Sequence, residues 1–227
     1  MDLNKRKWND DLKSFRNSLK GWDSEKIDMN LLSLLHAAVH ESSITGGITH
    51  SFFDEMLEGV KEDAFAVVPE KQKHSFAYHI WHTTRIEDIS IVYIIGKKDQ
   101  ILDSGNWMKK INSDIRHTGN SLTRDEVIEF SEKVNILQLL AYRREVAKET
   151  QSIINSMNPL DLKIKVKRSN YDEILENKDV LSDDMWLIDY WTKKDFSGLF
   201  LMPATRHHIL HISDALKYKK KIVNNDF

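Results

Sequence analysis

The histidines are the residues of this sequence that are numerous enough, and spaced closely enough, to support chemistry. The chain has 227 residues, with ten histidines and no cysteine. Without cysteine there is no disulfide framework, no thiolate nucleophile and no cysteine-ligated zinc or iron–sulfur site. Any metal chemistry must therefore depend on imidazole nitrogens.

Metal-binding histidines on a helix must lie about one turn apart. Residues i and i+4 differ by only about 40° around the helix axis, so both rings project from one side. Pairs at this spacing, or at i and i+3, occur in three places: His36 and His40, His79 and His82, and His207 and His211 with His208 between them. Pairs in three separate segments favour a shared site over chance spacing.

The surroundings of two pairs favour a buried position. His207 and His211 share a stripe with packing residues, as in the interior of a helix bundle. His79 and His82 lie in the most apolar long segment, where a neutral imidazole without a partner is costly. A common ligand would satisfy these rings. The alternative is that each ring bonds a backbone carbonyl, Glu87 or Asp88.

The remaining candidates have simpler interpretations. His50, His74 and His117 are predicted at helix starts or in loops, exposed to solvent. Arg85 lies one turn from His82 and could receive an anionic substrate group. A surface salt bridge from Arg85 to Glu87 or Asp88 is the interpretation that we favour.

The elements that must position these side chains are helices. Glycine (8) and proline (3) are too scarce for a fold that needs many turns. Apolar periodicity predicts four substantial helices, and two of their connections are long, so at least one crossover lets neighbouring helices run parallel. We therefore predict an all-α four-helix bundle with long crossovers. Its helices are expected at about 24–44, 70–95, 123–157 and 203–220.

Local signals refine these boundaries. An additional N-terminal helix, 5–19, carries one narrow apolar stripe: Trp8, Leu12, Phe15 and Leu19. Thr123 and Glu126 form a capping box, and Pro159 closes the helix that follows. The segment 160–194 is predicted as a crossover with a helical turn near 185–191, and the alternating residues 163–167 have no evident partner strand.

Charge and hydropathy argue against a nucleic-acid-binding protein and against a membrane protein. The 33 basic residues nearly balance the 35 acidic ones, so the net charge of −2 provides no field for nucleic acid. Neither the apolar core of a signal peptide nor a membrane-spanning run occurs, and we expect a cytoplasmic protein without membrane contact. Because no repeat or linker marks a boundary, we predict one domain over 1–227 with its core at about 24–220.

Two segments resemble a known family. The segment from Ser75 to Asp88, SFAYHIWHTTRIED, resembles the second-helix motif of the DinB-like superfamily. The segment from Met202 to Ala215, MPATRHHILHISDA, resembles its last-helix H-x-x-x-H motif. The helix count and the long crossovers agree with the four-helix bundle of that family.

The resemblance implies a divalent metal held by three histidines. His82 matches the ligand of the second helix, because Glu87 follows it at the spacing of the family, and His207 and His211 match the ligands of the last helix. The competing choices are His79 and His208. The motif assigns no role to His40. Because His40 is expected to face the interior of the bundle, it could be an accessory ligand or a hydrogen-bond partner.

The implied site favours catalysis. Three neutral imidazoles suit zinc or nickel and also allow iron or manganese. They leave coordination positions open, as in catalytic sites. Characterised relatives include transferases and isomerases that use a small bacterial thiol, such as mycothiol or bacillithiol, and others are labelled metal-dependent hydrolases. The leading hypothesis is an enzyme that activates a small thiol or water for attack on a small electrophile, with the thiol supplied as substrate.

The other hypothesis is a non-catalytic helical binding or regulatory module, whose histidines are incidental or hold a structural or vestigial metal. Its contact surfaces would be the basic segment 217–221 and the first helix. Narrow apolar stripes on the outer helices, together with the habit of the family, also predict a homodimer.

Overall fold

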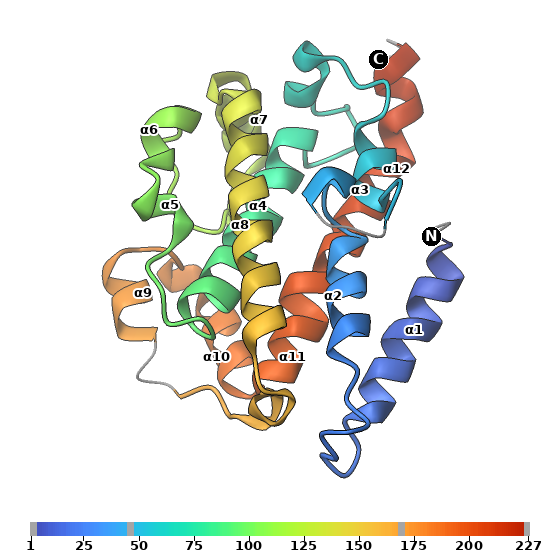
Figure 1. Cartoon of the computed structure of the whole chain (residues 1–227). Helices are drawn as coiled ribbons and strands as arrows, with labels where there is room; N and C mark the ends of the chain where they lie inside the picture. Colours follow the sequence, from blue (N-terminus) through green and yellow to red (C-terminus); the bar gives the residue numbers. More distant parts are fainter. Residues whose placement is uncertain (1–3, 45–47, 168–170, 225–227) are drawn as a thin grey trace.

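The protein is built from helices, and its described residues form no strand (Figure 1). The computed structural model describes residues 4–44, 48–167 and 171–224. Within these ranges, no helix combines the length and the apolar character needed to cross a membrane. The all-α prediction is confirmed.

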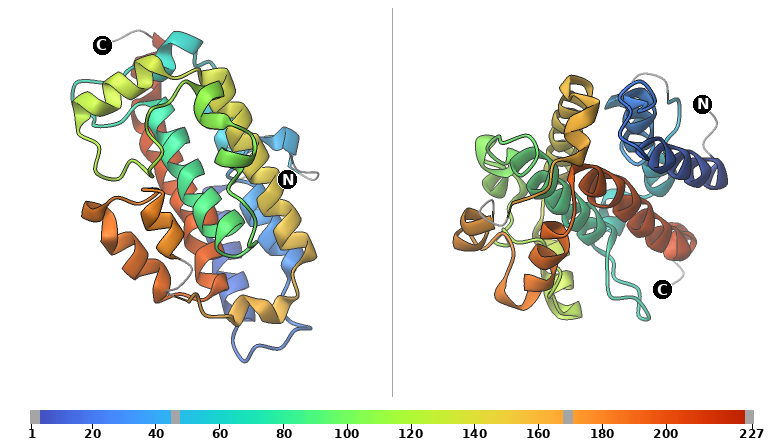
Figure 2. Two further views of the ribbon diagram at one scale, coloured as in Figure 1. Left: turned by 90° about the vertical axis from the view of Figure 1, so that its left-hand side faces the viewer. Right: turned by 90° about the horizontal axis from the view of Figure 1, so that it is seen from below.

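Four helices form the bundle. They are α2 (Met29–Ala37), α4 (Phe76–Glu87), α8 (Ile136–Ser156) and α12 (His207–Asn224). α2 packs against α8, α8 against α4, and α4 against α12. The ring is closed where η7 (Met202–Arg206), the turn before α12, contacts α2. Figure 2 shows α4 near the middle when the bundle is viewed from below, and all its residues are buried.

The N-terminal helix lies outside the bundle. α1 (Lys5–Ser18) packs against α2, and its buried residues are Trp8, Leu12 and Phe15. The indole nitrogen of Trp8 donates to the backbone oxygen of Leu35, 3.1 Å away. The predicted narrow stripe is therefore the face by which this helix attaches to the bundle.

The predicted bundle helices have different boundaries in the structure. The helix predicted at 70–95 begins only at Phe76, after its cap Ser75. The segment 24–44 is helical as α2 only over Met29–Ala37, because Asp28 caps that helix and its backbone is extended. The segment 123–157 is two helices, α7 (Arg124–Lys133) and α8, since Val134 is extended and the side chain of Asn135 caps a new helix. The capping box of Thr123 and Glu126 begins α7 as predicted.

Short helices fill the connections. Between the first two bundle helices lie η1 (Ser42–Ile44), α3 (Phe52–Leu57) and η2 (Glu62–Ala66). Between α4 and α7 lie α5 (Ile101–Ser104) and α6 (Trp107–Ile111), where the sequence predicts one helix. The last crossover holds η4 (Pro159–Lys163), α9 (Asp172–Glu176), η6 (Ser182–Asp184), α10 (Met185–Thr192) and α11 (Phe196–Leu201).

The last crossover agrees with the sequence in outline. α10 is the helical turn expected near 185–191. The alternating residues 163–167 make a single antiparallel bridge between Lys165 and Asp195 rather than a strand pair. Helical structure resumes at α11, earlier than the predicted start at 203, because the side chain of Asp195 caps it.

Two wide helical turns interrupt the helices that carry the histidines. α4 continues into η3 (Asp88–Tyr93), where the N–H of Ile94 bonds to the carbonyl of Ile89, five residues earlier. α11 continues into η7, which contains Pro203. Proline has no N–H to donate, so an ordinary helical turn cannot pass through it unchanged. Turns of this kind often lie beside functional residues, and η7 is followed directly by His207.

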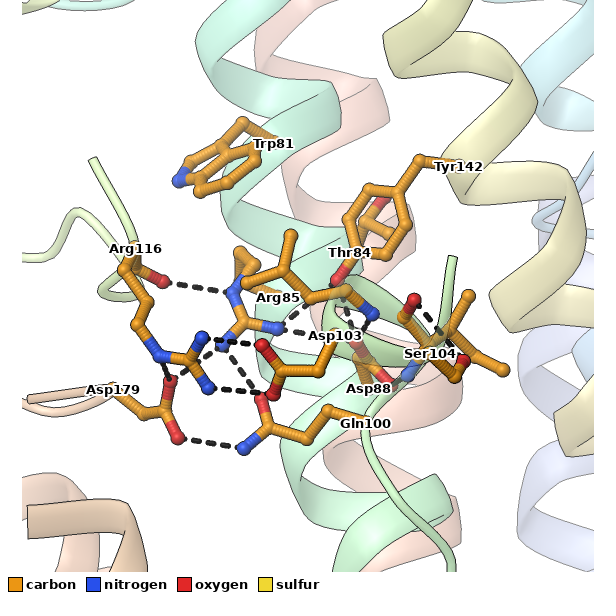
Figure 3. Close-up of polar contacts among 12 residues, drawn as sticks. Trp81, Thr84, Arg85, Asp88, Gln100, Asp103, Ser104, Arg116, Tyr142 and Asp179 are labelled. Carbon is orange, nitrogen blue, oxygen red and sulfur yellow. Dashed lines mark hydrogen bonds and ion pairs between the residues drawn. The ribbon is translucent and has the colours of Figure 1, made fainter. Parts of the chain in front are cut away.

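A buried arginine ties the crossovers to the bundle. The side chain of Arg85, on α4, has no exposed area. One terminal nitrogen donates to Asp88 at 3.1 Å and to Tyr142 at 3.0 Å. The other donates to Gln100 at 2.8 Å and to Asp179 at 2.9 Å, as Figure 3 shows. The predicted pairing with Asp88 is therefore present, but it is buried, and Arg85 is not available to a substrate.

The same arginine fixes the loop before α7. Its Nε donates to the backbone oxygen of Arg116 at 2.9 Å. The guanidinium of Arg116 in turn pairs with Asp103 and with Asp179 (Figure 3). The N–H of Thr118 donates to the backbone oxygen of Asp179. Residues 116–118 are thus held against α4 from two sides.

We expect Arg85→Leu to lower the free energy of unfolding by about 3–5 kcal/mol, because the change leaves the carboxylate of Asp88 buried without its cation and removes one of the two arginines that pair with Asp179. Urea denaturation followed by circular dichroism would measure it. Lys98→Met is the control, since Lys98 pairs with Glu149 at the surface and its loss should cost no more than about 1 kcal/mol. Equal costs for the two variants would show that the buried network does not stabilise the fold.

Candidate metal centre

His82, His207 and His211 come together between α4 and α12. Each offers one ring nitrogen, and the three nitrogens lie within 4.8 Å of one another. His82 is buried, whereas His207 and His211 are partly exposed. The cluster therefore has a closed side on α4 and an accessible side on α12.

The orientation of His82 suits a metal ligand. Its Nδ1 lies 2.7 Å from the backbone oxygen of Thr118. A carbonyl can only accept a hydrogen bond, so Nδ1 carries the hydrogen and Nε2 has a free lone pair. That Nε2 lies 3.1 Å from Nε2 of His207, close to the roughly 3.3–3.4 Å that separates two nitrogen ligands in a tetrahedral zinc site. A backbone carbonyl behind the ring is a common arrangement for metal-binding histidines.

The turn around Thr118 is built to present this carbonyl. Gly119 has φ of +81°, a left-handed conformation that glycine adopts without strain. Its N–H donates to Nδ1 of His117, and its carbonyl accepts from the hydroxyl of Tyr78. Sequence reasoning recognised the histidine pairs but not this turn, which lies 36 residues from His82 in the chain.

His79 lies behind His211. The Nδ1 atoms of the two rings are 2.8 Å apart, and His79 is 3% exposed. The sequence left His79 as a competing ligand on α4. The three-histidine cluster contains His82 in that place, while His79 contacts the ring of His211.

His74 and His117 differ from the prediction of solvent-exposed side chains. Both are partly buried, whereas His50 is exposed as predicted. The ring of His74 stacks on Tyr78 at 4.2 Å between ring centres, and Tyr78 stacks on His82 at 5.4 Å. The three parallel rings form one wall of the cluster. His74 carries no sequence signal for this position, because it precedes the helix cap Ser75.

A second histidine cluster surrounds Glu87. Nε2 of His36 lies 2.7 Å from Oε1 of this carboxylate. Nε2 of His40 and Nε2 of His208 lie 3.0 Å and 2.8 Å from Oε2. All four side chains are buried. His36, His40 and Glu87 are close enough together to hold a metal, so the two clusters must be distinguished by their hydrogen bonding.

The groups behind His36 and His208 are donors. The side-chain amide of Gln151 donates to the backbone oxygen of Ser33, which fixes its orientation, and the same nitrogen lies 2.8 Å from Nδ1 of His36. The guanidinium of Arg143 donates to Nδ1 of His208. Both Nδ1 atoms therefore accept, so in the neutral rings both Nε2 atoms carry hydrogen.

This second cluster is better described as a buried charge cluster around Glu87 than as a metal site. Nε2 of His36 and Nε2 of His208 carry hydrogen and point toward Glu87. A metal bound beside Glu87 would instead need a lone pair on each of these nitrogens. The buried positive charge of Arg143, which donates to His208, already interacts electrostatically with Glu87, so a divalent cation would add an uncompensated buried charge. Among the described residues, neither ring nitrogen of His40 has an aligned hydrogen-bond partner, and neither does Nε2 of His208 or Oε2 of Glu87. The contacts of His40 and His208 with Oε2 are therefore electrostatic.

Burial sets the charge of these rings. It lowers the pKa of His82 to about 4 and the pKa of His79 to about 3. It also lowers the pKa of His208 to about 4, with a further contribution from Arg143. Burial alone would raise the pKa of Glu87, but His40, His36 and His208 hold it well below its usual range. At pH 7, His79, His82 and His208 are neutral and Glu87 is ionised.

Comparisons with known proteins agree with this architecture. A family model described as the DinB superfamily matches residues 49–176. This range includes His82, whereas His207 and His211 lie beyond it. A solved structure, a conserved protein from Enterococcus faecalis, superposes with a TM-score of 0.61 at 18% sequence identity over 87% of this chain and 97% of that chain. At this identity the likeness concerns the fold. The search of curated proteins found no match.

We expect chelator-treated protein to lose stability between pH 6.5 and 5. The folded-state pKa values of His79, His82 and His208 lie below the unfolded value of about 6.5, so the unfolded chain binds more protons in this range. The free energy of unfolding therefore falls as the pH falls, by at least about 1 kcal/mol. Most carboxyl groups titrate at lower pH.

Urea denaturation at a series of pH values would measure this loss. His50→Ala is the control, since His50 is exposed and its removal should leave the slope unchanged. A free energy of unfolding that is constant across the range would contradict the neutral, buried state of the three rings.

Proposed function

The chain belongs to the DinB superfamily, and we propose that it is a metal-dependent enzyme in which His82, His207 and His211 hold a divalent cation. The observation that carries this proposal is the convergence of three imidazoles, one of which is held by Thr118 with its lone pair free. The Glu87 cluster lacks this property, since donors lie behind two of its rings.

The donor set favours particular metals. Three neutral nitrogen ligands suit zinc or nickel, and they also allow iron or manganese. The partial exposure of His207 and His211 supports a catalytic rather than a structural role, because it leaves a side of the cluster accessible to a small molecule.

A metal with open coordination positions would supply the acidity that deprotonates a water or a thiol at neutral pH. The residues of the chain supply the surroundings. His82 is held rigidly on the buried side, and the stacked rings of Tyr78 and His74 flank it. Among the described polar contacts, no arginine or lysine side chain contacts the three rings.

The nucleophile comes from solution. The chain has no cysteine, so a thiol reaction would use a low-molecular-weight thiol as substrate, and a hydrolytic reaction would use water. We propose transfer of such a thiol to a small electrophile, or hydrolysis of that electrophile, as the class of reaction.

The metal assignment predicts about one divalent ion per chain in the wild-type protein. His211→Gln should lose most of it, because a partly exposed ligand is removed without opening the core. His40→Gln is the matched control from the other cluster and should keep it. Plasma mass spectrometry after dialysis against zinc or nickel would measure both. Metal lost from the His40 variant and kept by the His211 variant would move the site to Glu87.

The enzyme assignment predicts metal-dependent consumption of thiol or electrophile. The protein would be incubated with 1-chloro-2,4-dinitrobenzene and a panel of small thiols, and free thiol would be titrated over time; the absence of cysteine means that the protein consumes no reagent itself. We expect activity that chelator and His211→Gln abolish and that His50→Ala preserves. Metal binding without turnover of any thiol in the panel or of 1-chloro-2,4-dinitrobenzene would favour a non-catalytic module.

A further inference from the structure

His79 makes a contact that the metal centre itself does not explain. Its Nδ1 lies 2.8 Å from Nδ1 of His211, and the two rings meet edge to face at 5.1 Å between centres. Rings on either side hold His79 in place: His74 at 5.4 Å and Tyr218 at 6.2 Å. Since His79 is 3% exposed, its orientation is fixed by packing.

Only one of the two Nδ1 atoms can carry the shared hydrogen. If His79 donates, Nε2 of His211 carries the hydrogen of that ring and has no lone pair for a cation. If His211 donates, its Nε2 is free to bind one. The direction of this hydrogen bond therefore decides whether His211 can be a ligand.

Resting on the proposed function, we propose that His79 is a positioning residue: the hydrogen-bond acceptor that holds His211 in its metal-binding tautomer. Its role toward His211 matches the role of the Thr118 carbonyl toward His82. The two ligands lie on different helices and are thus oriented by different groups, His82 by a backbone oxygen of a loop and His211 by a second imidazole. Groups of this kind usually contribute about 10–100-fold to metal affinity.

The proposal has a consequence for the outer nitrogen of His79. When Nδ1 accepts, Nε2 must carry the hydrogen of the neutral ring. Within the described ranges, Nε2 of His79 has no hydrogen-bond partner, and neither does the hydroxyl of Tyr218, whose ring lies beside it. In the metal-loaded protein, Nε2 of His79 therefore carries hydrogen, and His79 is not a second metal ligand.

A matched pair of substitutions at His79 distinguishes the effect of its hydrogen-bond acceptor from the effect of its side-chain shape. In His79→Asn, Oδ1 takes a position one bond beyond Cγ, like the Nδ1 that it replaces, so an acceptor remains. In His79→Leu, the side chain has the same branching but no acceptor. Dissociation constants for Zn²⁺, measured by competition with a chromogenic chelator, should rise about 10–100-fold for the Leu variant and much less for the Asn variant. Circular dichroism and urea midpoints would show that both are folded.

The outcomes separate this proposal from the proposed function. A Leu variant with the wild-type dissociation constant, or an Asn variant as weak as the Leu variant, would overturn the acceptor role and leave the metal site standing. Failure of the wild-type chain to bind Zn²⁺ would overturn both. The visible spectrum of the Co²⁺-loaded Leu variant should keep its wild-type shape, and a change that indicates a lost nitrogen ligand would make His79 a ligand instead.

A measurement on the wild-type protein keeps the test independent of folding in the variants. Long-range ¹H–¹⁵N correlation spectra of the zinc-loaded protein report which ring nitrogen of each histidine carries hydrogen. We expect the hydrogen on Nδ1 of His211 and on Nε2 of His79. The reverse assignment for either ring would overturn the proposal.

Discussion

A neutral imidazole has one N–H and one lone pair, and the group behind the ring decides which of them points forward. This constraint governs the interior of the bundle, because the buried face between α4 and its neighbours is lined with histidines. Behind His82 is a carbonyl, so a lone pair points forward. Behind His36 and His208 are an amide and a guanidinium, so hydrogens point forward, toward the carboxylate of Glu87. One set of residue types therefore forms two different environments within a few turns of the same helices.

The rest of the fold serves this arrangement. The carbonyl of Thr118 belongs to a loop, and a loop carbonyl is a useful partner only if the loop is fixed. Arg85 fixes it, through the backbone of Arg116 and through Asp179, at the cost of burying a guanidinium with several carboxylates. The long crossovers are thus not simple connections: they bring residues from distant parts of the chain against the central helix.

Much of this could be predicted from the sequence, and the failures have physical causes. Periodicity identified the helices and placed the ligand candidates His207 and His211 on one face, because helix geometry is local. It joined α7 and α8, since the apolar pattern continues across Val134 while the cap at Asn135 does not affect that pattern. It could not orient the rings: the partners of His82, His211 and His36 lie 36, 132 and 115 residues away. The interpretation of Arg85 as a surface residue failed for the same reason, because its burial depends on Gln100, Tyr142 and Asp179.

The wide turn η7 has a consequence for how such a site could arise. A turn of this kind contains one residue more than an ordinary helical turn, so the helix after it is rotated by about 100° relative to an uninterrupted one. α11 and α12 follow each other directly: α11 packs Leu199 and Phe200 into the core, and α12 carries His207 and His211. A single inserted residue is enough to re-aim one end of a long helix while the other end keeps its packing. The apolar anchor and the histidine face can therefore change independently in evolution.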